Sequence, residues 1–533
     1  MNEITLDSIL IHIGQFGKYQ MLNYLILALP MFLNSIFSVT YVFTASTVNH
    51  RCNITECDFT GSVFQEPWVN FTIPVQGNGD LSQCTRFSKV SDGDYSGQCD
   101  ERGFDNVIEK CDSFIVDKSQ SSISNEFGIY CGDEWKLSLV GTIHNVGQFV
   151  GIPLGGLISD KFGRRAAITL GGIISAVMGI ARSYSPNYTS FLVFEFLDAV
   201  GGSSLYASIF ILGIEFIGPK RRVLAASGLT VFYALGEIAF GLLSKYIPDW
   251  RLVLKLVYFP SLIHIALFWI LEESVRWLLT QRKNEKVKDQ LRKAARINKS
   301  ELPEEMLSGL IEGNEKKMEA DKSTQNFPIT LAFKTFFWRI LNCSLCWFTN
   351  VLVYYGLSLN SVALGGNKYD NFIWISAAEI PGFFSPVLLM DRLGRRYSLF
   401  GAMIISGLSI GCSVFINSDQ RVWQLALFFI GKLAITSSFQ VLYFATAEMF
   451  PTKVRHSLLS FCSMFGRFGS MLAPLTPLLG VYYAEGPAII FSACAIFSGF
   501  LALLFKETTE VELPNTLDDA EVLGNKKDDR EDI

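Results

Sequence analysis

Twelve long apolar stretches divide this sequence of 533 residues, and they constrain its fold more than any other feature. A helix needs roughly 20 apolar residues to cross about 30 Å of hydrocarbon, and each stretch approaches or exceeds that length. Charged residues are 18% of the chain and collect between the stretches, whereas a soluble fold would spread them over every segment. We therefore predict an all-α membrane protein. The predicted spans are residues 21–44, 136–158, 166–184, 190–217, 223–247, 253–271, 336–359, 370–390, 397–416, 422–447, 457–482 and 486–505.

Six of the eleven cysteines lie in the polar segment 45–134, between the first two spans. An even set in one polar segment predicts three disulfides, with 15 connectivities open. Zinc is the weaker alternative because the spacings are irregular and no Cys-x-x-Cys occurs, so no metal site is predicted. The sequons at Asn53 and Asn70 predict glycosylation, which, like disulfides, indicates an extracellular loop. The cysteines are Cys52, Cys57, Cys84, Cys99, Cys111 and Cys131.

Basic residues cluster in short connections that share one side of the membrane if the spans alternate in direction. The positive-inside rule makes that side cytoplasmic. Both termini are then cytoplasmic, namely residues 1–20 and an acidic tail at 506–533. A charge-rich loop at 276–335 separates the spans in 135–275 from those in 336–505, and it contains two expected surface helices, at 285–299 and 304–322.

Two motifs occur twice, and their spacing indicates an internal duplication. The first follows the second and eighth spans at an offset of 231 positions, and the other follows the fourth and tenth spans at an offset of 233. Two pairs in register predict two six-helix halves. The residues are Asp160, Gly163, Arg164 and Arg165 with Asp391, Gly394, Arg395 and Arg396, and Glu215 and Arg221 with Glu448 and Arg455.

These repeated charges lie where helices end at the cytoplasmic face. They can pair with neighbouring helix ends in one state and separate in another, so we expect them to act as gates. The alternative is that they only set topology. Arginines alone would set topology, so the repeated aspartate and glycine favour the gating role.

Longer motifs carry a family resemblance over nearly the whole chain. They include GTIHNVGQFVGIPLGGLISDKFGRR at 141–165, EFIGPKRR at 215–222, DWR at 249–251, EESVRWLL at 272–279, WFTNVLVYYGLSLN at 347–360, EIPGFF at 379–384, AEMFPTKVR at 447–455 and LPNTLDDAE at 513–521. With these motifs the chain resembles the organic cation, carnitine and organic anion transporters of the major facilitator superfamily, especially the insect organic cation transporter-like branch. The resemblance implies alternating access between two six-helix halves at the plasma membrane.

Charges inside predicted spans are candidate binding residues, because each costs roughly 2.5–3.5 kcal/mol to insert and so usually faces a partner or a pathway. The candidates are Glu237, Glu379, Lys432 and Arg467. The resemblance places Glu379 near cationic cargo, whereas the alternative is a structural ion pair with Lys432 or Arg467. Glu237 fits either a pathway or an internal pair.

Arg467 departs from the cation-preferring members of the family that the chain resembles, which have aspartate at this position. The carnitine and anion branches have arginine there. A guanidinium is suited to bidentate binding of a carboxylate, so Arg467 favours zwitterions or anions as the cargo. The alternative is that Arg467 only neutralises Glu379 or Glu237.

Aromatic side chains supply the rest of the expected site. Trp347 and Tyr354 are seven residues apart and share a helix face, where they can contact a cation. The resemblance places them, and Gln440, along the central pathway, although the aromatics fit a lipid-facing position as well. His144 can couple transport to protons, or it can be a hydrogen-bonded bundle residue.

We predict a transporter of small organic cations or carnitine-like zwitterions. An organic anion transporter, a sugar facilitator and a non-transporting receptor are the alternatives. No nucleotide-binding motif occurs, and the Gly-x-Ser-x-Gly match at 407–411 lies inside a span, so neither an enzyme nor a cofactor is expected. The expected partners are the small ion, the lipid bilayer and, for a zwitterion, a coupling sodium ion or proton. No basic patch indicates nucleic acid. The oligomeric state stays open.

Overall fold

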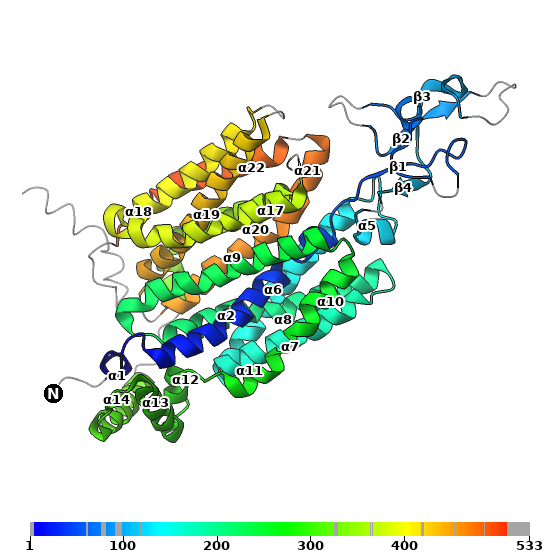
Figure 1. The fold of residues 1–533 in the computed structure, drawn as a ribbon. Helices are drawn as coiled ribbons and strands as arrows, with labels where there is room; N and C mark the ends of the chain where they lie inside the picture. Colours follow the sequence, from blue (N-terminus) through cyan, green and yellow to red (C-terminus); the bar gives the residue numbers. More distant parts are fainter. Residues whose placement is uncertain are drawn as a thin grey trace, which may run out of the picture.

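The computed structural model describes residues 5–59, 62–75, 81–90, 99–117, 119–323, 329–362, 364, 366–416, 420–451, 454–483 and 485–508. Within them, long helices form a bundle with a small strand-containing extension at one end and short helices at the other (Figure 1). The motif at 513–521 and the tail from residue 509 lie outside the described residues.

Nine helical stretches of the described chain are long and apolar enough to cross a membrane. One of them, Lys368–Ser413, is divided at Gly394, where φ is +77° and ψ is +175°. Two further helices, α6 and α22, lie in the same bundle (Figure 1). The division of Lys368–Ser413 adds one crossing to the nine, and α6 and α22 add two more, so the described chain has the predicted twelve.

The first six crossings form one half of the bundle. Within it α2 packs on α9, and α8 packs on both α6 and α7. The helices are α2 (Lys18–Val39) with α3 (Tyr41–Thr44), α6 (Trp135–Phe162), α7 (Arg164–Ser183), α8 (Tyr188–Glu215), α9 (Arg222–Tyr246), and α10 (Trp250–Ser261) with α11 (His264–Ile270). The short η2 (Pro219–Arg221) precedes α9.

The second six crossings form the other half, in which α18 packs on α19 and α22, and α16 packs on α20. The halves meet where α9 contacts α17 and α18 and where α6 contacts α20 and η4. The helices are α15 (Ile329–Thr335), α16 (Phe337–Ser361), α17 (Lys368–Ala377), α18 (Glu379–Ser413), α19 (Arg421–Met449), α20 (Arg455–Leu472) with η4 (Ala473–Leu475) and α21 (Thr476–Tyr482), and α22 (Gly486–Ala502).

Glycines let the helices of each half approach closely. A Cβ added at Gly151 of α6 would lie 2.8 Å from Val200 Cα of α8. A Cβ added at Gly469 of α20 would lie 3.0 Å from Leu352 N of α16. Small residues are common at such contacts because helix association in lipid depends on close van der Waals packing.

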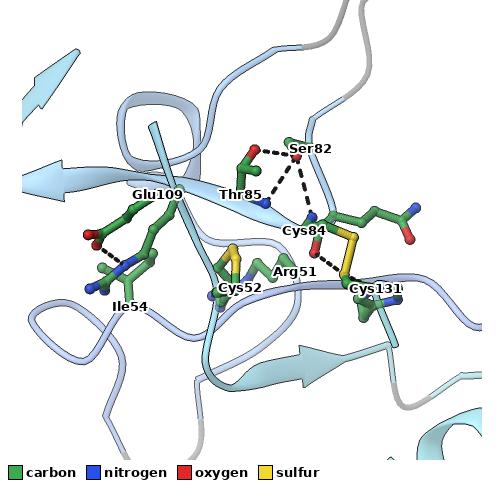
Figure 2. The surroundings of a disulfide bond; sticks show 12 residues. Arg51, Cys52, Ile54, Ser82, Cys84, Thr85, Glu109 and Cys131 are labelled. Carbon is green, nitrogen blue, oxygen red and sulfur yellow. Dashed lines mark hydrogen bonds and ion pairs between the residues drawn. A yellow bond between two sulfur atoms is a disulfide. The ribbon is translucent and has the colours of Figure 1, made fainter. Parts of the chain in front are cut away.

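The cysteine-rich segment forms the extension and confirms the three predicted disulfides. They join Cys52 to Cys111, Cys57 to Cys99, and Cys84 to Cys131. Figure 2 shows the surroundings of Cys52 and Cys84. Two antiparallel strand pairs order the segment, β1 (His50–Cys52) with β4 (Phe114–Val116) and β2 (Thr85–Lys89) with β3 (Phe104–Lys110). Its helices are α4 (Val69–Thr72), η1 (Glu101–Gly103) and α5 (Ile123–Glu126).

A buried cation holds the first part of this segment together. Arg51 is 2% exposed and pairs with Asp58 at 2.8 Å, and its guanidinium lies 4.6 Å from the centre of the Trp68 ring. His50 lies 3.5 Å from Cys131 Sγ, and burial lowers its pKa. His50, Cys84 and Cys131 are close enough to hold a metal, but the two sulfurs are bonded to each other.

The segment is fastened to the first half through the DWR motif. Glu126 of α5 accepts a hydrogen bond from Trp250 Nε1 at 2.9 Å and pairs with Arg251. The second half touches the segment at the start of α17, where Lys368 Nζ donates to Ser46 Oγ at 3.3 Å and to Gln120 Oε1 at 3.2 Å.

The opposite end carries α1 (Leu6–His12), α12 (Val275–Thr280), α13 (Asn284–Asn298) and α14 (Glu304–Ser323). Figure 1 shows these helices together at that end. They share a separate apolar core. The last two correspond to the expected surface helices. Asn298 joins this cluster to the bundle, because its Oδ1 accepts from the Tyr19 backbone N–H at 2.9 Å.

Candidate substrate site and gates

A buried ion pair lies at the break between α17 and α18. The break, at Ala378, comes three residues before Pro381, whose missing N–H cannot continue the helical hydrogen bonds. Glu379 Oε1 lies 2.8 Å from Lys432 Nζ of α19, and both side chains are 0% exposed. The structural pair with Lys432, one of the two alternatives for Glu379, is therefore formed.

Tyr354 of α16 completes this pair. Its hydroxyl donates to Glu379 Oε1 at 2.7 Å, and Lys432 Nζ lies 3.2 Å from the centre of its ring. Lys432 also donates to Ser358 Oγ, one turn further along α16, at 2.7 Å. Tyr354 was predicted from the sequence to contact a cationic cargo. In the structure its ring faces the bundle interior and contacts the ammonium group of Lys432.

Glu237 adds a second carboxylate from the other half. It lies on α9, is 1% exposed, and interacts with Glu379 and Ser376 through its side chain. Two carboxylates therefore share one ammonium group at a contact between the halves. Glu237, Glu379 and Lys432 are called the acidic cluster below.

Arg467 of α20 faces the opposite half without a carboxylate partner. It donates through Nη1 to Gln148 Oε1 of α6 at 2.9 Å, and it bonds to the side chain of Tyr355. Among the described residues it forms none of the ion pairs. Tyr355 also interacts electrostatically with Glu237 and Glu379, so it is a neighbour of both Arg467 and the acidic cluster. Arg467 is therefore not the ion-pair partner of Glu379 in this structure.

The other two expected site residues are buried beside different neighbours. Trp347 is 3% exposed, donates through Nε1 to Thr446 Oγ1 at 3.2 Å, and packs edge-on against Phe439 and Tyr443. Gln440 is 7% exposed. The lipid-facing alternative for Trp347 is thus not what the structure has.

Buried charges in the first half were missed by the sequence reasoning. Arg182 pairs with Glu195 and, at 3.4 Å, with Asp198, and His144 Nδ1 lies 2.8 Å from Glu195 Oε1. All four side chains are at most 2% exposed. Arg182, Glu195 and Asp198 also fall inside predicted spans, so the signal that singled out Glu379 could have found them. Gln148 and Tyr355, being uncharged, gave no such signal.

The repeated motifs form one structure twice. Glu273 accepts from the backbone N–H of Arg164 at 2.9 Å, directly after Gly163, whose φ is +104°. Glu507 likewise accepts from the backbone N–H of Arg395 at 3.0 Å, after Gly394. Each carboxylate caps a helix N-terminus, where negative charge is stabilised. Burial raises the pKa of Glu273, and these hydrogen bonds oppose the shift.

In each half, the arginine that follows the glycine forms an ion pair with the glutamate of the other repeated motif of that half. Arg164 lies 3.8 Å from Glu215, and Arg395 lies 3.0 Å from Glu448. Asp160 pairs with Arg164 at 3.4 Å although its side chain is 78% exposed. The ion pairs that these motifs form among the described residues each join residues of one half.

The remaining motif residues differ in the hydrogen bonds that they form. Arg222, rather than the expected Arg221, is the counterpart of Arg455, because Arg222 donates to Ile217 O and Arg455 to Phe450 O. Arg221 and Asp391 are exposed. The backbone N–H groups of Arg165 and Arg396 join the caps made by Glu273 and Glu507.

Comparisons with known proteins agree with this arrangement. Residues 101–516 match the sugar (and other) transporter family. The organic cation transporter protein of Drosophila melanogaster is 30% identical over 529 residues, covering 98% of this chain and 95% of that protein. Organic cation/carnitine transporter 2 of Rattus norvegicus is 29% identical, covering 96% and 93%. The E. coli xylose transporter XylE, in a partially occluded inward-open conformation, shares the fold with a TM-score of 0.63 and 13% identity, covering 93% of this chain and 100% of that chain.

Proposed function

Since this chain belongs to the sugar (and other) transporter family, and within it to the organic cation and carnitine transporters, we propose that it carries small organic ions by alternating access and prefers zwitterions. The separation of charge at the contact between the halves supports this preference. The acidic cluster holds two carboxylates for one ammonium, whereas Arg467 is bound to neutral groups.

An ammonium-bearing cargo fits the acidic cluster. A charge there is attracted by the surplus carboxylate and can contact the faces of Tyr354 and Tyr355. The cargo has to compete with Lys432, which now occupies Glu379 and the face of Tyr354. A permanent cation needs no ion coupling, because 100 mV of membrane potential supplies about 2.3 kcal/mol per charge.

A carboxylate on the same cargo fits Arg467. The guanidinium presents a planar fork of donors, and replacing its bonds to neutral Gln148 and Tyr355 by a carboxylate gives charge-assisted bonds. Because Tyr355 is a neighbour of both charged regions, one small zwitterion can engage both. A hexose has no charge to match either, and an anion would leave the surplus carboxylate without a partner.

Alternating access follows from where these residues lie. Glu237 and Gln148 belong to the first half, whereas Glu379, Lys432, Tyr354 and Arg467 belong to the second. Rocking of one half against the other opens the site to one side and closes it to the other. The gates of each half, described above, then bias which state is populated.

We further propose the plasma membrane as the location, with both termini in the cytoplasm. Disulfides and sequons are typical of extracellular segments, and the basic connections lie at the other end of the bundle, so both support this orientation. Surface biotinylation of intact cells tests the location. Epitope tags at the two termini test the orientation, because antibodies should reach them only after the cells are permeabilised.

The transport test uses purified full-length protein in liposomes. Uptake of labelled L-carnitine, tetraethylammonium, benzoate and glucose is measured for the wild type and for Arg467→Asp. The variant is expected to lose L-carnitine uptake by about 10- to 100-fold, because a charged hydrogen bond contributes about 1.5–3 kcal/mol, and to retain tetraethylammonium uptake. Arg421→Gln, a change at an exposed arginine that starts α19, is the control and should behave as wild type.

Three outcomes would contradict the proposal. Binding without time-dependent accumulation would indicate a receptor. Glucose uptake that is indifferent to Arg467→Asp would indicate a sugar facilitator. Benzoate uptake exceeding that of L-carnitine would indicate an organic anion transporter.

A further inference from the structure

A continuous chain of hydrogen bonds runs from Arg467 in the second half into the core of the first. Arg467 Nη1 donates to Gln148 Oε1 at 2.9 Å, and Gln148 Nε2 lies 3.1 Å from His144 Nε2. His144 Nδ1 lies 2.8 Å from Glu195 Oε1, and Glu195 pairs with Arg182. This chain is one of the contacts between α20 and α6, beside the hydrogen bond from Thr142 Oγ1 to Met471 O and the ring contact of Phe149 with Phe468.

The direction of every bond in this chain is fixed by chemistry. A guanidinium only donates, so the Gln148 atom that faces Arg467 must be the carbonyl oxygen. The amide nitrogen of Gln148 therefore faces His144 and donates to it. His144 Nε2 must then be an acceptor, so its single proton is on Nδ1 and is donated to Glu195. In this arrangement the imidazole is neutral.

Protonation of His144 is incompatible with this arrangement. Both nitrogens of an imidazolium donate, so Gln148 would have to turn its carbonyl oxygen toward His144. Its amide nitrogen would then face Arg467, donor against donor. The proton on His144 and the bond between Arg467 and Gln148 thus exclude each other.

We propose that His144 is the binding site of a co-transported proton, which releases Arg467 for the carboxylate of the substrate. This inference rests on the proposed function, since it requires a carboxylate-bearing cargo. The proton adds to the Nε2 lone pair of His144, the link to Gln148 opens, and the guanidinium is free to bind the anionic group. Proton and carboxylate therefore favour each other, and the coupling is symport.

The surroundings of His144 suit a cation. Glu195 of α8 contacts His144 directly, and the ring of Tyr41 of α3 lies 5.1 Å away between centres. Glu195 in turn pairs with Arg182 of α7, which also contacts Asp198 of α8 and Tyr258 of α10. Two carboxylates against one guanidinium leave one negative charge, which an imidazolium neutralises. Among ordinary side chains, histidine is the one that changes charge between pH 5 and 8.

Linkage makes the coupling measurable from both sides. If the proton strengthens carboxylate binding by some factor, the carboxylate strengthens proton binding by the same factor. Coupling energies of about 1–3 kcal/mol are typical, which corresponds to about 5- to 150-fold. We expect L-carnitine to bind roughly 10-fold more tightly at pH 6 than at pH 8, within that range.

The experiment uses full-length protein in liposomes that contain a pH-sensitive dye. The buffers are potassium-based and sodium-free, with valinomycin to hold the potential at zero. Addition of L-carnitine outside should acidify the lumen, and an inward proton gradient should accelerate L-carnitine uptake. Binding is measured separately between pH 6 and 8 on detergent-solubilised protein.

Three variants separate the role of His144 from a structural one. His144→Gln removes the titration and should abolish both proton movement and the pH dependence of binding. Gln148→Glu accepts from the imidazolium and from Arg467 at once, so the link survives protonation and coupling should again be lost. His264→Gln is the matched control, because His264 is equally buried and bonds only to Ser261 O in this structure among the described residues. It should keep the wild-type pH dependence.

The outcomes distinguish this inference from the proposed function. L-carnitine uptake without lumen acidification, or with unchanged pH dependence in both His144→Gln and Gln148→Glu, would refute the proton site and leave the transporter intact. Absence of L-carnitine binding at every pH would refute the proposed cargo and the proton site together. If His144→Gln does not fold, judged by its thermal midpoint, Gln148→Glu decides the question.

Discussion

Replacing Gly163 by alanine should destabilise the first half through one identifiable contact. Gly163 has φ +104° and ψ +163°, a region that is essentially restricted to glycine, so alanine costs about 1–3 kcal/mol in the backbone alone. The added Cβ would also lie 2.7 Å from Glu273 Cδ and closer still to Oε2. The carboxylate therefore has to leave the N-terminus of α7.

Losing that cap adds a second cost. Glu273 accepts from the backbone N–H groups of Arg164 at 2.9 Å and of Arg165 at 3.2 Å. A carboxylate at a helix N-terminus contributes about 1–2 kcal/mol. Together the two terms amount to about 4 kcal/mol. Since 1 kcal/mol shifts the midpoint of a unit of about 250 residues by about 2 °C, the thermal midpoint should fall by about 8 °C.

The assay is thermal unfolding of the purified protein in detergent, with three comparison variants. Glu273→Ala removes only the cap and should lower the midpoint by about half as much, because the backbone term is absent. The double variant should be less destabilised than the sum of the two single ones, since the clash disappears with the carboxylate. Gly156→Ala, where a new Cβ in the interior of α6 meets nothing within 4 Å, should not lower the midpoint. Strict additivity, or an equal effect of Gly156→Ala, would refute the reasoning.

Three further predictions follow from the structure. Lys432→Met leaves buried carboxylates without a cation and should lower the free energy of unfolding by about 3–5 kcal/mol. The double variant Lys432→Met/Glu379→Leu should recover most of that loss, and equal instability of the double variant would contradict the prediction. Cys57→Ser with Cys99→Ser opens a loop of 42 residues and should cost the extension about 4 kcal/mol, seen as faster trypsin cleavage; unchanged cleavage would oppose it. Asn70 is exposed, so Asn70→Gln should increase electrophoretic mobility to the extent of one glycan; unchanged mobility would contradict glycosylation at this site.

The fold could be predicted from the sequence because its determinants are local. Apolar length indicates the crossings, and the distribution of basic residues predicts their direction. The disulfide partners could not be predicted, since pairing depends on where β2, β3 and the chain near Cys131 come to lie. The helix caps were also missed: Glu273 and Glu507 lie far along the chain from the glycines they adjoin, and only the folded halves bring them together.

The candidate site was predictable only in part. A charge in an apolar stretch is visible in the sequence, so Glu237, Glu379, Lys432 and Arg467 could be selected. Which of them pair depends on helix rotation, and the structure joins Glu379 to Lys432 while Arg467 bonds to Gln148. Neutral partners such as Gln148 leave no trace in a hydropathy pattern.

The attachment of the cysteine-rich extension has a practical consequence. Glu126 of the extension binds Trp250 and Arg251 of the first half, so the extension should move together with that half. Its contact with the second half is made by the hydrogen bonds that Lys368 donates. An antibody fragment raised against the extension would therefore serve as a fiducial for one half in electron microscopy. Fluorophores on the fragment and on the second half would then report the rocking angle during turnover, in single molecules and without labels inside the bundle.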